Sequence, residues 1–173
     1  MLYHTLLLLS LCLLWPLPAQ AASCFPQATL PPLVAQGQRL ALPSHGHTTP
    51  LFIALGFEPT QQANLEATLA AVQALATGKG SPLKLAEIAV VDQQHQPYAK
   101  QIEPFMQKAV QDKRWLPVVY PYYANKASLR QTLGLGAKAN TTYVLCDSKG
   151  QRLWQANTAR LSPQQLEALK QAW

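Results

Sequence analysis

The sequence predicts an α/β fold, in which a mixed sheet carries helices on both faces. Apolar runs bounded by proline, glycine or aspartate alternate with segments of helical period, and this order favours parallel strands joined by helices. A hairpin pattern near the C-terminus adds antiparallel strands. With 173 residues, of which 49% are hydrophobic and 13% charged, the chain has the composition of a globular protein with a hydrophobic core.

The N-terminal residues have the pattern of a secretory leader. Residues 6–14 are apolar apart from one serine, two prolines follow, and Ala19-Gln20-Ala21 supplies the small residues that a signal peptidase needs for a cut before Ala22. The apolar run is short for a membrane-spanning helix. We therefore expect a signal peptide over residues 1–21 and a periplasmic or secreted protein. An uncleaved membrane anchor and a lipoprotein anchored through Cys24 are the alternatives.

Removal of the leader leaves 152 residues, a suitable length for one domain. We divide them into a lead-in segment, residues 22–48, and a single domain, residues 49–173. The lead-in is rich in proline and glutamine, and only residues 39–42 have the pattern of a strand.

The domain opens with a strand, a helix and a second strand. Residues 50–57 form a continuous apolar run, which predicts a strand buried on both faces. A helix follows from Pro59-Thr60, with Thr60 as its N-cap, and Gly78 and Gly80 end it. Residues 83–91 form the second apolar run and predict the second strand.

Prolines interrupt the middle of the domain. Residues 98–110 place their apolar side chains on one helical face, but Pro104 requires the helix either to begin there or to kink. Residues 116–120 are predicted to be a short third strand, and the neighbouring prolines favour an edge position or a strand start. Asn125 is a suitable N-cap for a short helix.

The last forty residues contain the clearest local signals. Residues 141–147 and 151–155 have the pattern of two strands, and the turn between them contains Gly150, which tolerates a positive φ. Ser162 and Gln165 form a capping box around a first-turn proline, and they predict a final helix.

This order of elements resembles the thioredoxin superfamily over roughly residues 50–173. The resemblance is carried by the hairpin Thr142-Tyr143-Val144-Leu145-Cys146-Asp147-Ser148-Lys149-Gly150-Gln151-Arg152-Leu153-Trp154 and the terminal helix after it. Two groups look most similar: the thioredoxin-fold assembly factor of the mitochondrial ATP synthase, and exported bacterial proteins of the YtfJ type. The Leu-Gly segment that they place before the hairpin begins here at Leu129. The resemblance implies a fold and not a site.

Two features of the redox-active members are missing from the sequence. Those members carry Cys-x-x-Cys after the first central strand, where a helix N-terminus lowers the pKa of the thiol. Here that place holds Gly56-Phe57-Glu58-Pro59-Thr60-Gln61. The superfamily usually places a cis-proline before the strand that begins at Thr141, and here Asn140 precedes it. The resemblance therefore implies a redox-inactive module for binding, assembly or chaperoning. We expect a protein that is not an enzyme and that holds no cofactor.

Cys24 and Cys146 are the cysteines that follow the leader. In an oxidising compartment a pair of cysteines suggests one structural disulfide. The alternative is a buried, unpaired Cys146 with Cys24 free or acylated. An alternative function follows from the same residue, because a thiol or peroxide-handling oxidoreductase could use Cys146 alone if its thiol were exposed with a lowered pKa.

Histidines supply weak candidates for a metal site. His45 and His47 form a His-x-His pair whose imidazoles project to one side of an extended loop, and His95 lies further along the chain. Thioredoxin-fold copper carriers use a cysteine pair with a histidine, and this chain has no such pair. We expect exposed loop histidines and no bound metal, with a histidine-based metal carrier as a further alternative function.

A candidate partner surface combines aromatic and basic residues in one stretch. Its members are Trp115, Tyr120, Tyr122, Tyr123, Lys113 and Arg114. Such side chains can hold a partner protein or the edge of an anionic membrane, although we expect at least half of the aromatics to pack in the core.

The charge distribution is consistent with such partners. The net charge is +6, and from Lys100 onward 11 basic residues stand against 4 acids. The basic residues are scattered singly, which argues against nucleic acid as a partner.

Overall fold

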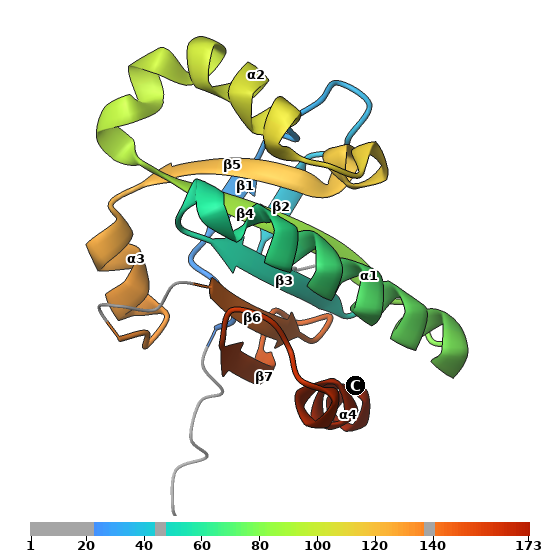
Figure 1. Cartoon of the computed structure of the whole chain (residues 1–173). Helices are drawn as coiled ribbons and strands as arrows, with labels where there is room; N and C mark the ends of the chain where they lie inside the picture. Colours follow the sequence, from blue (N-terminus) through green and yellow to red (C-terminus); the bar gives the residue numbers. More distant parts are fainter. Residues whose placement is uncertain (1–22, 44–47, 137–140) are drawn as a thin grey trace, which may run out of the picture.

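A five-stranded mixed sheet forms the centre of the computed structural model, which describes residues 23–43, 48–136 and 141–173 (Figure 1). The strand order is β5-β4-β3-β6-β7. The strands are β3 (Leu51–Gly56), β4 (Lys84–Asp92), β5 (Val119–Ala124), β6 (Thr141–Cys146) and β7 (Arg152–Asn157). Strand β3 pairs parallel with β4 and antiparallel with β6, and β4 pairs parallel with β5. The predicted mixed α/β sheet is confirmed.

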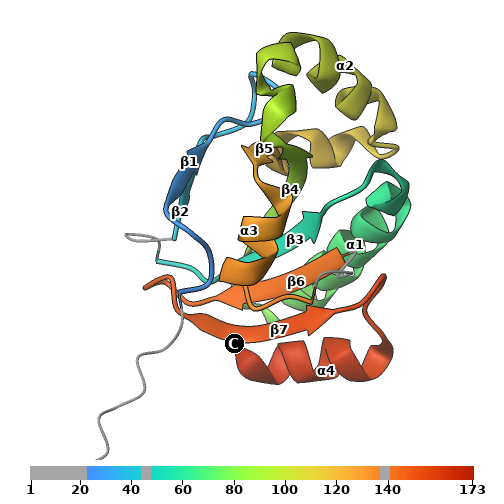
Figure 2. The same cartoon turned by 90° about the vertical axis from the view of Figure 1, so that its left-hand side faces the viewer.

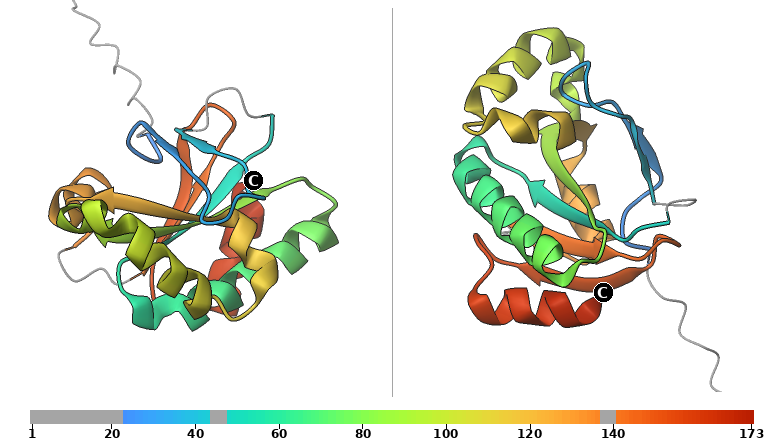
Figure 3. Two further views of the ribbon diagram at one scale, coloured as in Figure 1. Left: turned by 90° about the horizontal axis from the view of Figure 1, so that it is seen from above. Right: turned by 90° about the vertical axis from the view of Figure 1, so that its right-hand side faces the viewer.

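Helices cover both faces of this sheet. They are α1 (Gln62–Lys79), α2 (Ala99–Ala109), α3 (Lys126–Thr132) and α4 (Pro163–Ala172), with 3-10 turns at η1 (Pro59–Gln61), η2 (Gln93–Tyr98) and η3 (Lys113–Val118). Helices α1 and α4 lie on one face, α3 lies on the other, and α2 lies across the β5 edge (Figures 2 and 3). Among the described residues, no helix combines the length and apolarity that crossing a membrane requires.

Strand β3 divides the hydrophobic core in two. All six of its residues are buried, as the continuous apolar run predicts. Because successive side chains of a strand point to opposite faces, Leu51, Ile53 and Leu55 pack on the α3 side, whereas Phe52 and Ala54 pack on the α1 side.

The lead-in segment is part of this core. Strands β1 (Ala28–Leu30) and β2 (Leu40–Leu42) form a small antiparallel sheet. Their buried leucines and Phe25 pack with β3 and α3 on one face of the main sheet. Strand β2 matches the expected strand at residues 39–42, whereas β1 was not predicted, because its three residues are too few for a periodic pattern.

The first helical turn begins differently from the prediction, and the start of α2 decides between the two predicted alternatives. The N-cap before the first helical turn is Glu58 instead of Thr60. Gln61 closes this turn, because its side-chain Oε1 accepts hydrogen bonds from the backbone N–H groups of Phe57 (2.8 Å) and Glu58 (3.2 Å). Helix α2 begins at Ala99 and contains Pro104 within it, so the helix does not begin at the proline.

The third strand lies further along the chain than expected. Residues 113–118 form a 3-10 turn, and β5 runs from Val119 to Ala124 with Pro121 inside it. A proline is tolerated there because β5 is an edge strand, the position that the prolines favoured. Asn125 caps α3 as predicted, since its Oδ1 accepts a hydrogen bond from the Ser128 N–H (2.9 Å).

The C-terminal elements agree with the local signals. Gly150 turns the β6–β7 hairpin with a φ of 77°. Ser162 and Gln165 form the reciprocal capping box of α4: the Gln165 N–H donates to Ser162 Oγ (3.3 Å), and the Ser162 N–H donates to Gln165 Oε1 (2.9 Å).

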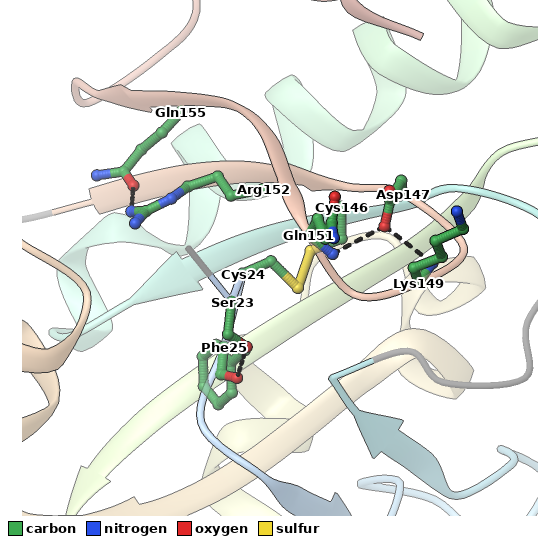
Figure 4. The surroundings of a disulfide bond; sticks show 9 residues. All are labelled: Ser23, Cys24, Phe25, Cys146, Asp147, Lys149, Gln151, Arg152 and Gln155. Carbon is green, nitrogen blue, oxygen red and sulfur yellow. Dashed lines mark hydrogen bonds between the residues drawn. A yellow bond between two sulfur atoms is a disulfide. The ribbon is translucent and has the colours of Figure 1, made fainter. Parts of the chain in front are cut away.

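A disulfide joins the lead-in to the end of β6. Cys24 and Cys146 are bonded, with their Cα atoms 5.7 Å apart, and each is 0% exposed. Figure 4 shows the bond beside the hairpin turn. The backbone N–H of Cys24 donates to Gly150 O (3.0 Å), which holds the lead-in against that turn. The sequence left open whether these cysteines are bonded to each other or separate, and in the structure they are bonded.

Loss of this bridge should lower stability. The disulfide links residues 122 positions apart, so its removal frees a long loop in the unfolded chain. We expect the Cys24→Ala/Cys146→Ala variant to lose about 2–5 kcal/mol of unfolding free energy in denaturant titrations under oxidising conditions. An unchanged midpoint would show that the bridge contributes nothing to stability.

Candidate functional site

A cavity of about 410 Å³ lies on the α1 face of the sheet, between α1, α2 and β4. Strand β4 supplies Glu87, Ala89 and Val91, α1 supplies Leu65, and α2 supplies Met106. The cavity extends to Gly56 and Asp92 at the carboxyl ends of β3 and β4. Ligands of open α/β sheets commonly bind at these ends of parallel strands.

Glu87 is a buried acid in the lining of this cavity. It is 0% exposed, and in the sheet it lies between Ala54 of β3 and Val119 of β5. Gln62 Nε2 donates to Glu87 Oε2 (3.3 Å), whereas Oε1 has no hydrogen-bond partner among the described residues. Burial raises the pKa of Glu87 to about 7; the hydrogen bond from Gln62 opposes this rise, and the nearby charge of Glu66 adds to it.

Glu66, the second buried acid of this region, has a full set of partners. Its two carboxyl oxygens accept hydrogen bonds from the backbone N–H groups of Gln111 and Asp112, both at 2.8 Å. Gln62 Nε2 also donates to Glu66 Oε1 (3.1 Å). Glu66 therefore ties α1 to the segment that follows α2, and it holds two walls of the cavity together.

The junction between β3 and α1 lies at the mouth of the cavity and carries no sulfur. Phe57, Glu58 and Pro59 line the cavity there; Glu58 and Pro59 are exposed, whereas Phe57 is buried. Lys126 Nζ donates to Phe57 O and to Glu58 Oε1, the latter at 3.2 Å. The Arg130 guanidinium lies 4.4 Å from the centre of the Phe57 ring. An aromatic ring, an ion pair and a proline therefore stand where redox-active members of the thioredoxin superfamily carry two thiols.

The disulfide lies at the opposite end of β3 from this junction. In the antiparallel register of β3 and β6, Cys146 pairs with Leu51, and Thr141 pairs with Gly56. Leu51 and Gly56 are the two ends of the strand, so they are separated by about 17 Å of extended chain. The predicted Cys24 and Cys146 pair is therefore buried and remote from the cavity.

The aromatic members of the predicted partner surface do not share one surface. Trp115 and Tyr120 are each only 6% exposed, and they belong to the hydrophobic clusters on opposite faces of the sheet. Tyr122 is half-buried, with its ring 5.6 Å from that of Phe25. Tyr123 donates to Glu103 Oε1 (3.4 Å). Alternation along β5 sends neighbouring side chains to opposite faces, and a partner surface in this region stays a prediction.

The basic members of that set have local structural contacts. Lys113 Nζ donates to backbone carbonyls at the end of α2, including that of Gln107 at 2.7 Å. Arg114 forms an ion pair with Asp112 (2.6 Å). Both residues are exposed, and neither contacts the cavity.

The histidine candidates are not brought together as a site. His45 and His47 lie outside the described residues. His95 is exposed and lines the cavity. In the part of the chain that the structure describes, no group of three or more histidine, cysteine, aspartate or glutamate side chains is arranged to hold a metal ion.

The cavity and its buried acid were not predicted from the sequence. A signal was present, since Glu87 interrupts the apolar run Ala86-Glu87-Ile88-Ala89-Val90-Val91. A glutamate inside a strand with apolar neighbours is rarely buried without a partner or a role.

Comparison with known proteins shows the fold. No protein-family model matches the chain, and no curated protein matches its sequence. The exposed lipoprotein thioredoxin Etrx1 of Streptococcus pneumoniae is similar in structure, with a TM-score of 0.56 and 10% identity over 85% of this chain and 99% of that chain. A secreted thiol-disulfide isomerase from Corynebacterium glutamicum has a TM-score of 0.55 and 13% identity over 86% of this chain and 84% of that chain.

A third similar structure is Arabidopsis thaliana ScoI with copper bound. Its TM-score is 0.54, with 9% identity over 87% of this chain and 98% of that chain. These proteins are thioredoxin-like, and the chain therefore has a thioredoxin-like fold. At such low identity the likeness concerns the fold alone.

The raised pKa of Glu87 predicts how the stability of the protein depends on pH. Because the pKa of Glu87 is raised from 4.5 to about 7 in the folded state, the folded chain binds the proton more tightly than the unfolded chain. Stability should therefore fall as the pH rises from 4.5 to about 7, by at most about 3 kcal/mol, and the fall should be complete above that window.

The Glu87→Gln variant should lose this component of the pH dependence, while Glu58→Gln, which changes an exposed glutamate at the cavity mouth, should keep it. Urea titrations across the window measure the difference. Parallel profiles for the wild type and Glu87→Gln would refute the assignment.

Proposed function

We propose that this chain is an exported, redox-inactive protein of thioredoxin-like fold that acts as a binding module of the assembly or chaperone type. One observation carries the proposal: the junction where redox-active relatives place two thiols holds Phe57, Glu58, Pro59 and Thr60. Thiol–disulfide exchange requires a thiolate that can reach a partner disulfide. No thiol is available at this junction, whereas the cavity beside it can accept a ligand.

The state of the cysteines supports the same function. Cys146 is 0% exposed and bonded to Cys24 at the far end of the sheet, so it presents no thiol for the alternative of a one-cysteine oxidoreductase. The histidine-based carrier also lacks support among the described residues, where His95 is the histidine that lines the cavity.

Export is supported by the N-terminal residues and by the disulfide. Residues 1–21 have the leader pattern, and disulfides persist in oxidising compartments. Two structurally similar proteins are described as an exposed lipoprotein and as a secreted protein. We assign residues 49–173 to the thioredoxin-like domain and residues 22–48 to its lead-in. We also propose that the partner is a protein.

The resemblance to two particular groups of thioredoxin-fold proteins is also part of this proposal. The segment from Thr142 to Trp154 resembles the ending of the assembly factor of the mitochondrial ATP synthase and of exported YtfJ-type proteins. An assembly or chaperone-type role is compatible with a fold that keeps the sheet and lacks the dithiol.

An insulin-reduction assay tests the absence of redox activity. The purified exported protein should give no turnover above the background of dithiothreitol, because no thiol lies at the βα junction. The Phe57→Cys/Thr60→Cys variant, which recreates the Cys-x-x-Cys spacing on the same scaffold, serves as the matched positive control. Wild-type turnover that disappears in Cys146→Ala would contradict the proposed function.

A further inference from the structure

The cavity has the size and the walls of a small-molecule site. Its volume of about 410 Å³ falls within the range of ligand pockets. Aliphatic side chains supply much of its surface, including Leu65, Ile102, Met106, Val110 and Val119. These walls suit the apolar part of a ligand, because burial of apolar surface is the general driving force for binding.

The inner end of the cavity offers one unused acceptor. Glu87 Oε1 is buried and has no hydrogen-bond partner among the described residues, although a carboxyl oxygen has two acceptor positions. A buried polar atom without a partner is costly, so a ligand donor that reaches Oε1 gains the interaction that the protein lacks. Gln62 is half-buried and donates to Glu87 Oε2 and to Glu66, so the other oxygen of Glu87 is already engaged.

The charge of the cavity is opposite to that of the protein. The net charge is +6, yet the charged residues of the lining include the acids Glu58, Glu87 and Asp92. Lys126, the lysine of the lining, is paired with Glu58. Glu66 lies beside Glu87 through the shared Gln62 side chain. An acidic cavity in a basic protein attracts cations and disfavours carboxylate or phosphate ligands.

The geometry of Glu87 also distinguishes between kinds of cation. A guanidinium binds best when both carboxyl oxygens are free, because it donates two parallel hydrogen bonds. In Glu87 one oxygen already accepts from Gln62, and only Oε1 is without a donor. A single free oxygen fits a compact ammonium group, which acts as a point charge.

We propose that this cavity binds a small apolar amine, with the ammonium group on Glu87 Oε1 and the apolar part between α1 and α2. The proposal rests on the binding function above and names the ligand class for that site. The same chemistry is present in a free amine and in the amino terminus of a peptide that begins with an apolar residue, and the test separates these two sources.

The direct test is an NMR titration of the exported protein with three probes of similar apolar part. They are 2-phenylethylamine, 2-phenylethanol and 3-phenylpropionate. We expect the amine to shift the backbone amide signals of Leu65, Ala89 and Met106. It should bind about tenfold more tightly than the alcohol, and its advantage over the carboxylate should be larger than about tenfold.

Variants assign the effect to Glu87. Glu87→Gln should reduce amine affinity about tenfold and make the amine and the alcohol nearly equal, because it removes the charge and keeps the shape. Ala89→Leu should weaken both probes by filling the cavity. Glu167→Gln, which changes an exposed glutamate of α4 outside the cavity lining, should change amine affinity little. Amide spectra with the dispersion of the wild type establish that each variant is folded.

The pH dependence of binding provides a second readout. Gln62 and Glu66 of α1 face Glu87, and Tyr143 of β6 lies in the same row of the sheet, on the other side of Ala54. The other titratable or charged residues of the lining are Glu58, Asp92, His95 and Lys126. Burial raises the pKa of Glu87 to about 7, so amine affinity should increase from about pH 5.5 to about pH 8 as Glu87 ionises. The increase should persist in His95→Gln and disappear in Glu87→Gln.

Two peptide probes, Phe-Gly-Gly with a free amino terminus and the same peptide with an acetylated amino terminus, complete the test of the amine's source. Binding of Phe-Gly-Gly with a free amino terminus, tighter than that of 2-phenylethylamine, would assign the site to peptide amino termini, and the reverse order would assign it to free amines. Both results support the proposal.

Three outcomes would overturn the proposal. In the first, the acetylated peptide binds as tightly as the peptide with a free amino terminus. In the second, the amine and the carboxylate bind equally. In the third, Glu87→Gln leaves the amine affinity unchanged. None of them depends on insulin turnover, so the ligand class can fail while the redox-inactive binding function stands.

Discussion

The direction of β3 between its two neighbours determines where each chemical group of this protein lies. Because β3 runs antiparallel to β6, the end of β6 with Cys146 lies beside Leu51, and the start of β6 lies beside Gly56 and the βα junction. The bridge to Cys24 is therefore buried at one end of the sheet (Figure 4), and the cavity opens toward the other end. The sheet is thioredoxin-like, and the cysteines of the described residues form a buried bond between the lead-in and β6.

Helix α1 carries polar residues against the sheet, where an apolar face would normally pack. Gln62 and Glu66 are four residues apart, so both lie on the side of α1 that faces Glu87. Glu66 is satisfied by the backbone N–H groups of Gln111 and Asp112, and it stabilises the fold. Glu87 is left with one acceptor unused. A local conflict of this kind, compensated at one acid and not at its neighbour, is typical of a functional site.

Local patterns in the sequence predicted much of the fold. The apolar runs of β3 and β4, the glycine of the β6–β7 turn and the capping box of α4 are signals within a few residues, and each element forms near its predicted position. The site depends on contacts between distant residues, which such patterns do not contain. Glu87 meets Gln62 across 25 positions, and the cysteines pair across 122. Trp115 and Tyr120 are close in sequence but pack on opposite faces, because β5 begins between them.

The central claim is that the cysteines of the folded protein form a buried structural bridge and take no part in exchange. The most direct measurement is alkylation of the folded exported protein by iodoacetamide in the presence of reduced glutathione, followed by mass spectrometry of the peptides that contain Cys24 and Cys146. Our account predicts that both remain bonded and unmodified until a denaturant is added, because the bridge is inaccessible to a thiolate. Ready reduction and alkylation of either cysteine in the folded protein would contradict it.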